Sequence, residues 1–158
     1  MIKDLETAIG YRFRNIALLQ NALTHSSYAN ERWHNSLLSN ERLEFLGDSI
    51  LGMVVAGYLF ENFPDRPEGE LTRMRADMVC ETSLAAIATR LNLGEHLLLG
   101  HGEERFGGRN RASILADAVE SVIAAAFLDG GMNAAADIIT RFVLCDVPVW
   151  PWCANCRV

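Results

Sequence analysis

The sequence lacks any apolar run long enough to cross a membrane. None of its hydrophobic stretches reaches the roughly 18 to 20 residues that a transmembrane helix needs. The first residues, Met1-Ile2-Lys3-Asp4-Leu5, begin an acidic, amphipathic stretch that does not resemble a signal peptide. We therefore expect no membrane association and no export.

Cysteine is scarce, and positive charge is outweighed by negative charge. Four cysteines in 158 residues are too few for a disulfide scaffold, which favours reduced thiols and a cytoplasmic location. The net charge of −6 has the wrong sign for a domain that holds nucleic acid by charge alone. Any binding of nucleic acid therefore needs a local feature that overcomes the repulsion from the protein's net negative charge.

No stretch alternates apolar and polar residues cleanly enough to predict a strand, so we expect an all-α fold. The sequence shows no internal repeat, low-complexity tract or linker, which predicts one domain over residues 1–146 and an atypical tail over 147–158. Helices are expected over 2–9, after a cap at Asn15, from Ser39 or Asn40 to Asn62, from Pro67 onward, over 84–91, from a cap at Ser113 to Leu128, and over 133–145, with loops at 25–38 and 101–110.

Acidic residues share one face of the long helix that begins near Asn40. At 100° per residue, Glu41, Glu44 and Asp48 lie within about 60° of one another, opposite the apolar side chains. Like charges at this spacing destabilise a helix by roughly 0.2 to 0.5 kcal/mol per pair. A solvated acidic face and a ligand set both fit this pattern.

A second acidic pair, Asp117 and Glu120, stands in a helix that is apolar nearly all round. Unpaired carboxylates in such a helix cost several kcal/mol or become protonated, unless arginines or a metal ion neutralise them. Two helices that each present carboxylates can surround a divalent ion with the oxygen ligands that Mg²⁺ prefers. We therefore predict a metal site between Asp117 and Glu120 and the acidic face of the helix that begins near Asn40.

Other candidate residues are less specific. Glu70 fits either a first-turn residue that stabilises the helix dipole or a further outer ligand. The four histidines have no metal-ligand spacing, and no Gly-x-Ser-x-Gly or phosphate-binding glycine loop is present, so we expect no nucleophilic serine and no organic cofactor.

One run of ten residues resembles the signature of the ribonuclease III family, and four further segments agree with that family's nuclease domain in order and spacing. The signature is Asn40-Glu41-Arg42-Leu43-Glu44-Phe45-Leu46-Gly47-Asp48-Ser49, and the other segments are 10–13, 22–28, 68–76 and 113–121. The resemblance covers about residues 4 to 145.

This resemblance implies an all-helical, homodimeric endonuclease that cuts double-stranded RNA, in rRNA and mRNA precursor processing. It implies Mg²⁺, with Mn²⁺ as a substitute, and products with 5′-phosphate and 3′-hydroxyl ends and short 3′ overhangs. Position by position, Glu44, Asp48, Asp117 and Glu120 match the family's catalytic, metal-binding carboxylates, and Glu41 and Glu70 match two accessory acidic positions.

The sequence departs from bacterial members of this family at its end. These usually continue into a double-stranded-RNA-binding domain, whereas residues 147–158 resemble nothing in the family, and we expect a truncated or altered terminus. The Cys153/Cys156 pair is similar to a thioredoxin-type motif but lacks the βαβ context, and two cysteines do not complete a tetrahedral zinc site.

Two contact surfaces are also expected. Phe45 points away from the core stripe of its helix and predicts a dimer contact, with a locally covered side chain as the alternative. Arg105, Arg109 and Arg111 precede the Asp117 helix and fit either RNA backbone contacts or a solvated loop. The competing functions are a non-catalytic RNA-binding or dimerisation module of the same fold and a metal-dependent phosphohydrolase acting on small nucleotides.

Overall fold

Helices make up nearly all of the secondary structure in the computed structural model, which describes residues 2–145. Within these residues, the pairing outside helices is one isolated parallel bridge between Thr24 and Leu98. The elements are α1 (Ile2–Ile9), α2 (Ile16–Ala22), α3 (Ser26–Trp33), η1 (Ser36–Leu38), α4 (Glu41–Asn62), α5 (Glu68–Val79), α6 (Glu81–Arg90), η2 (Leu93–His96), α7 (His101–Arg105), η3 (Gly108–Asn110) and α8 (Ala112–Phe142). The all-α prediction is confirmed.

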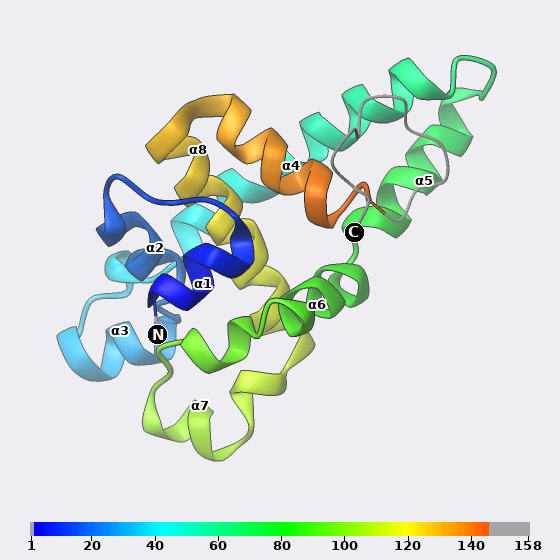
Figure 1. Cartoon of the computed structure of the whole chain (residues 1–158). Coiled ribbons are helices and arrows are strands. Elements are labelled where there is room, and N and C mark those ends of the chain that lie inside the picture. The colour runs from blue at the N-terminus through cyan, green and yellow to red at the C-terminus, as the bar shows by residue number, and fades with distance from the viewer. Residues whose placement is uncertain (1, 146–158) are drawn as a thin grey trace.

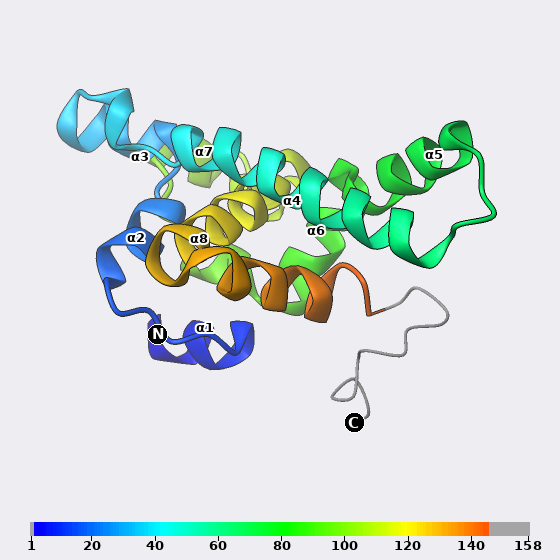
Figure 2. The same ribbon diagram turned by 90° about the horizontal axis from the view of Figure 1, so that it is seen from above.

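Helix α8 lies at the centre and packs against α4, α6 and α2 (Figures 1 and 2). Its first half is apolar nearly all round because it is surrounded, and Ile123, Ala124 and Ala125 are at most 1% exposed. Helices α4 and α5 form a hairpin whose far end projects from the body of the protein, as Figure 2 shows. The core therefore sits between α8 and its neighbours, and α4 and α8 run side by side through it.

The prediction that no stretch is long and apolar enough to cross a membrane is wrong for α4, which has the length and composition to do so. Its Leu51, Val55 and Leu59 side chains, however, are at most 1% exposed and belong to the protein's own core. This is the packing of a central core helix.

Several helix boundaries agree with the sequence prediction. Helix α1 ends before Gly10, whose φ of 73° is the left-handed conformation that glycine tolerates. The Asn15 side chain accepts a hydrogen bond from the amide of Ala17 and so caps α2, as predicted. The residue at the N-cap of α4 is Asn40, but its side chain makes no capping hydrogen bond.

Three local predictions are wrong. Residues 25–38 and 101–110 are not loops, because they contain α3 and η1, and α7 and η3, respectively. Helix α3 has no apolar periodicity in its sequence because Ala29 is its one buried residue. Its N-cap is His25, whose imidazole accepts a hydrogen bond from the amide of Ser27. Helix α8 begins at Ala112, so Ser113 lies inside it and is not its cap.

Helix α8 is broken at Gly131, as the glycine pair predicts, where φ is 78° and ψ is −171°. The Asp129 carboxylate accepts hydrogen bonds from the Tyr11 hydroxyl and from the amides of Arg14 and Asn15, each at 2.8 Å. The loop between α1 and α2 is therefore attached to the turn at which α8 changes direction. The tail expected over 147–158, with its Cys153/Cys156 pair, lies outside the described residues, and the domain boundary stays a prediction.

Gly47 sets how closely α4 approaches α8. A Cβ atom at this position would collide with the main-chain carbonyl oxygen of Glu120. Because the obstacle is backbone and not the end of a flexible side chain, a larger residue forces the two helices apart.

We predict that Gly47→Ala lowers the free energy of unfolding by about 2–3 kcal/mol. Urea denaturation measures this loss. The matched control is Gly69→Ala on α5, where a Cβ meets nothing within 4 Å, and the control should not be destabilised. A Gly47→Ala variant as stable as the wild type would show that the two helices do not depend on this close approach.

Candidate metal centre

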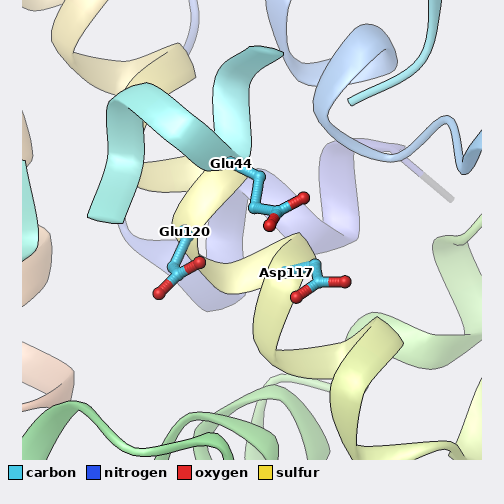
Figure 3. Close-up of side chains that lie close together, drawn as sticks. All are labelled: Glu44, Asp117 and Glu120. Atoms are coloured by element: carbon cyan, nitrogen blue, oxygen red, sulfur yellow. The ribbon is translucent and has the colours of Figure 1, made fainter. Parts of the chain in front are cut away.

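Three carboxylates from two helices converge on one side of the α4–α8 contact. Glu44 comes from α4, and Asp117 and Glu120 come from α8 (Figure 3). One carboxylate oxygen from each residue lies within 4.8 Å of the others. Residues that are more than 70 positions apart in the sequence therefore offer ligands to a single point in space.

The apolar packing of the two helices produces this convergence. On α4, Leu43, Gly47 and Ile50 are buried toward α8 and leave Glu44 at the edge of the interface. On α8, Ala118 and Val119 are buried between Asp117 and Glu120, which sit i,i+3 on the same edge. All three carboxylates are partly buried, so water reaches them but does not surround them.

The three carboxylates repel one another in this partly buried setting. Burial is the largest cause that raises the pKa of Glu120 to about 7, and the charges of Asp48, Asp117 and Glu44 contribute to this rise. Burial is also the main cause that raises the pKa of Glu44, with Asp117, Glu41 and Asp48 as additional causes. Within the described residues, these three side chains accept no hydrogen bond and form no ion pair that compensates this cost.

Two neighbours of Asp117 were not predicted from the sequence. Burial raises the pKa of Asp117, the nearby His25 lowers it, and Glu81 at the start of α6 raises it. His25 is placed by its main chain, because its amide donates to the Leu98 carbonyl at 3.1 Å. The position of His25 in the sequence does not predict that it lies near Asp117, because this proximity depends on the bridge between Thr24 and Leu98.

The donor set fits a divalent metal ion. All three side chains offer hard, anionic oxygen, which suits Mg²⁺ or Mn²⁺ and not a soft metal that prefers sulfur. A bound cation would offset both the burial of these carboxylates and the repulsion between them. The predicted ligands Glu44, Asp117 and Glu120 are thus brought together by the fold.

The other predicted acidic residues lie around or beyond this group. Asp48 is exposed and outside the three-residue cluster, although its charge reaches Glu120 and Glu44. Glu41 is exposed one turn before Glu44 and influences it electrostatically. Glu70 is on α5, where it forms an i,i+4 ion pair with Arg66 at 2.8 Å, and it is not among the residues that influence the cluster.

The three arginines before α8 differ in what they already contact. The Arg109 guanidinium donates to the Gly94 and Leu97 carbonyls at 2.8 and 2.9 Å and pairs with Glu104 at 2.6 Å, so it holds η2 against η3. Arg111 pairs with Glu103 at 2.9 Å. Within residues 2–145, Arg105 has no such partner, so of the three it is the one whose cation is available for an external contact.

Phe45 lies on a separate, apolar surface of α4. Its side chain is 77% exposed, and Met53 and Phe60 on the same helix are 56% and 75% exposed. Because these positions are about two turns apart, they form one apolar stripe along α4, next to the acidic edge. The prediction that Phe45 points away from the core is confirmed, and its role in a dimer stays a prediction.

Comparisons with known proteins identify the family. Residues 15–147 match a protein-family model described as Ribonuclease-III-like. The chain is 53% identical to Ribonuclease 3 of Clostridium tetani over 143 residues, which cover 90% of this chain and 58% of that protein. It is 56% identical to Ribonuclease 3 of Symbiobacterium thermophilum over 137 residues, covering 87% and 55%. The chain therefore spans little more than half the length of these relatives.

Solved structures give the same result for the fold. A crystal structure of the nuclease domain of ribonuclease III from Campylobacter jejuni matches with a TM-score of 0.85 and 42% identity, over 94% of this chain and 97% of that one. A second structure of the same domain matches with a TM-score of 0.86 and 42% identity over 94% of this chain and all of that one, and its title refers to flexibility in a region involved in dimer formation.

The raised pKa of Glu120 predicts how stability depends on pH in the absence of metal. A folded-state pKa of about 7, against an ordinary value of 4.5, stabilises the fold at low pH. This contribution is lost as the pH rises from about 4.5 through about 7. Glu120→Gln removes the charge and should therefore be more stable than the wild type at about pH 8, by about 2 kcal/mol once the shift is discounted for the partial exposure of the group, with little difference near pH 4.5.

Urea denaturation in EDTA at both pH values measures this difference. Glu95→Gln, a change at an exposed residue of η2, is the control and should follow the wild type at both. A wild-type protein that matches Glu120→Gln at about pH 8 would contradict the electrostatic account of the cluster.

Proposed function

The chain belongs to the ribonuclease III family, and from this membership and its three-carboxylate cluster we propose that it is a metal-dependent endoribonuclease. The proposed substrate is double-stranded RNA, cut by hydrolysis into products with 5′-phosphate and 3′-hydroxyl ends. The observation that carries the proposal is the convergence of Glu44, Asp117 and Glu120, three partly buried and uncompensated carboxylates. We propose Mg²⁺ as the ion, with Mn²⁺ as a substitute.

A bound divalent ion would supply the activation of water and the charge stabilisation that phosphodiester hydrolysis requires. The protein's own residues have three tasks in this proposal. Glu44, Asp117 and Glu120 hold the ion, Asp48 adds negative charge at the exposed rim, and the buried helices α4 and α8 keep these groups in place. Because Glu120 has a pKa of about 7, it has to lose a proton when it binds the ion near neutral pH.

Charge explains why the ion matters for the substrate as well as for the chemistry. The chain has a net charge of −6, and the acidic cluster alone repels phosphate. Cations at the cluster reverse the local field that a phosphate group meets. We expect the duplex to be recognised by its A-form shape and 2′-hydroxyl groups, with Arg105 as a candidate contact to the backbone.

The rival proposal, a non-catalytic RNA-binding or dimerisation module, explains the cluster less well. Such a module gains nothing from three carboxylates whose pKa values are raised, mainly by burial, at a helix interface. A phosphohydrolase acting on small nucleotides would in turn need a base-binding pocket beside the carboxylates. Four cavities among the described residues are lined by other side chains.

We further propose that the protein acts as a homodimer through the exposed apolar stripe of α4 formed by Phe45, Met53 and Phe60. A stripe of three large apolar side chains on one helix is costly to leave in water. Because the stripe lies beside the acidic edge of α4, a dimer formed through it would have the acidic cluster of each subunit near the interface. A region of the Campylobacter jejuni nuclease domain is named as involved in dimer formation, which supports a homodimer.

Glu120→Gln tests the catalytic proposal. The change keeps the side-chain volume but removes a ligand charge, so we predict a loss of Mg²⁺-dependent cleavage of long duplex RNA of at least about 100-fold. Gel analysis of the products at low millimolar Mg²⁺, with EDTA as a blank, measures it. Glu95→Gln should cleave like the wild type, and cleavage by Glu120→Gln within tenfold of the wild type would reject Glu120 as an inner ligand.

Phe45→Glu tests the dimer. A charge at the Phe45 end of the apolar stripe cannot be buried without a partner, so we predict a monomer at micromolar concentration in sedimentation experiments. The control is Phe106→Glu, since Phe106 is 83% exposed but lies after α7, away from the stripe. It should remain dimeric. A Phe45→Glu variant that sediments as the wild type does would remove Phe45 from the interface.

A further inference from the structure

Ser121 is a buried polar residue in the most apolar helix of the protein. It follows Glu120 directly, and its side chain is 0% exposed. A buried hydroxyl group is costly unless it forms a hydrogen bond. Its partner does not belong to α8: the Ser121 hydroxyl donates to the main-chain carbonyl oxygen of Asn40, at the start of α4, at 3.3 Å.

The same carbonyl oxygen is part of the first turn of α4. It accepts the amide of Glu44 at 2.9 Å and the amide of Leu43 at 2.8 Å. One oxygen atom therefore connects the backbone of Glu44 with the residue that follows Glu120. These hydrogen bonds link the two helices beside the carboxylates that they carry.

Asn40 also forms hydrogen bonds with a third segment, the end of α2 and the residues that follow it. Its side chain is 3% exposed and, instead of capping α4, donates to the Ala22 carbonyl at 3.3 Å. Its amide donates to the Thr24 carbonyl at 2.8 Å. The start of α4 is thus attached both to the end of α2 and to α8, in a polar contact surrounded by apolar core.

We propose that Asn40 and Ser121 are positioning residues that hold Glu44 at the right distance from Asp117 and Glu120 for metal binding. This inference rests on the proposed metal centre and adds what keeps it assembled. Without an ion, three carboxylates whose oxygens lie within 4.8 Å of one another repel one another, and this repulsion favours a movement of α4 away from α8 on the side of the cluster. The Asn40–Ser121 link opposes that movement where it arises, one residue from Glu120 and one helical turn from Glu44.

A purely structural role makes a different prediction. If the link only stabilised the fold, its loss would lower the free energy of unfolding and leave the metal affinity of the folded protein unchanged. If it positions the ligands, its loss weakens metal binding even in the folded protein, because supporting contacts of this kind set metal affinity. Metal affinity, measured without RNA or cleavage, therefore separates the two roles.

The experiment is a Mn²⁺ titration of the full chain by calorimetry, under conditions where circular dichroism shows each variant folded. We expect Ser121→Ala to bind Mn²⁺ about tenfold more weakly than the wild type. The matched control is Ile139→Val, which shortens a fully buried side chain of α8 beyond the Gly131 break. It should be destabilised and yet bind Mn²⁺ as the wild type does.

A second variant tests whether both residues act through the same link. Asn40→Ala should also weaken Mn²⁺ binding, and the double variant should lose less than the product of the two single losses, because both changes disturb the same carbonyl oxygen. Ser121→Ala with an affinity within twofold of the wild type would overturn the proposal while leaving the metal centre intact. If Glu120→Gln bound Mn²⁺ as tightly as the wild type, the metal centre itself would fall, and the positioning role with it.

Discussion

The close crossing of α4 and α8 is the contact on which the rest of the structure depends. Gly47 lies against the main-chain carbonyl of Glu120, and no residue with a side chain fits there without moving a helix. The crossing buries the apolar faces of both helices and at the same time brings Glu44 to Asp117 and Glu120. Folding and the proposed chemistry therefore rely on the same contact: attraction between apolar surfaces holds together three groups that repel one another.

The sequence predicts much of the candidate site because two of the ligands are charged residues within an otherwise apolar helix. Two carboxylates in a helix as apolar as 114–128 call for a compensating partner, and helical periodicity puts them on one edge. Periodicity does not distinguish Glu44 from Asp48, since both share the acidic face of α4. The structure separates them: Glu44 is partly buried within the cluster, whereas Asp48 is exposed at its rim.

The features that were not predicted from the sequence depend on contacts between residues far apart in the chain or on unusual local hydrogen bonds. Helix α3 is capped by an imidazole and buries a single alanine, so neither its start nor its inner face has the usual pattern. Arg109 looks like a free cation in a glycine-rich loop, yet it is bound to the carbonyls of residues 94 and 97. Asn40 has the residue type of a helix cap and serves as a link between three segments.

The break at Gly131 divides the longest helix into two parts with different freedom to vary. The part before it carries Asp117 and Glu120, and Asp129 anchors its end to the loop between α1 and α2 through three hydrogen bonds. Because those bonds fix the orientation of the first part, small shifts or changes of sequence beyond the break need not reach the carboxylates. Changes in the second half of α8 should therefore alter stability, through buried residues such as Ile138 and Ile139, more than the arrangement of the acidic cluster.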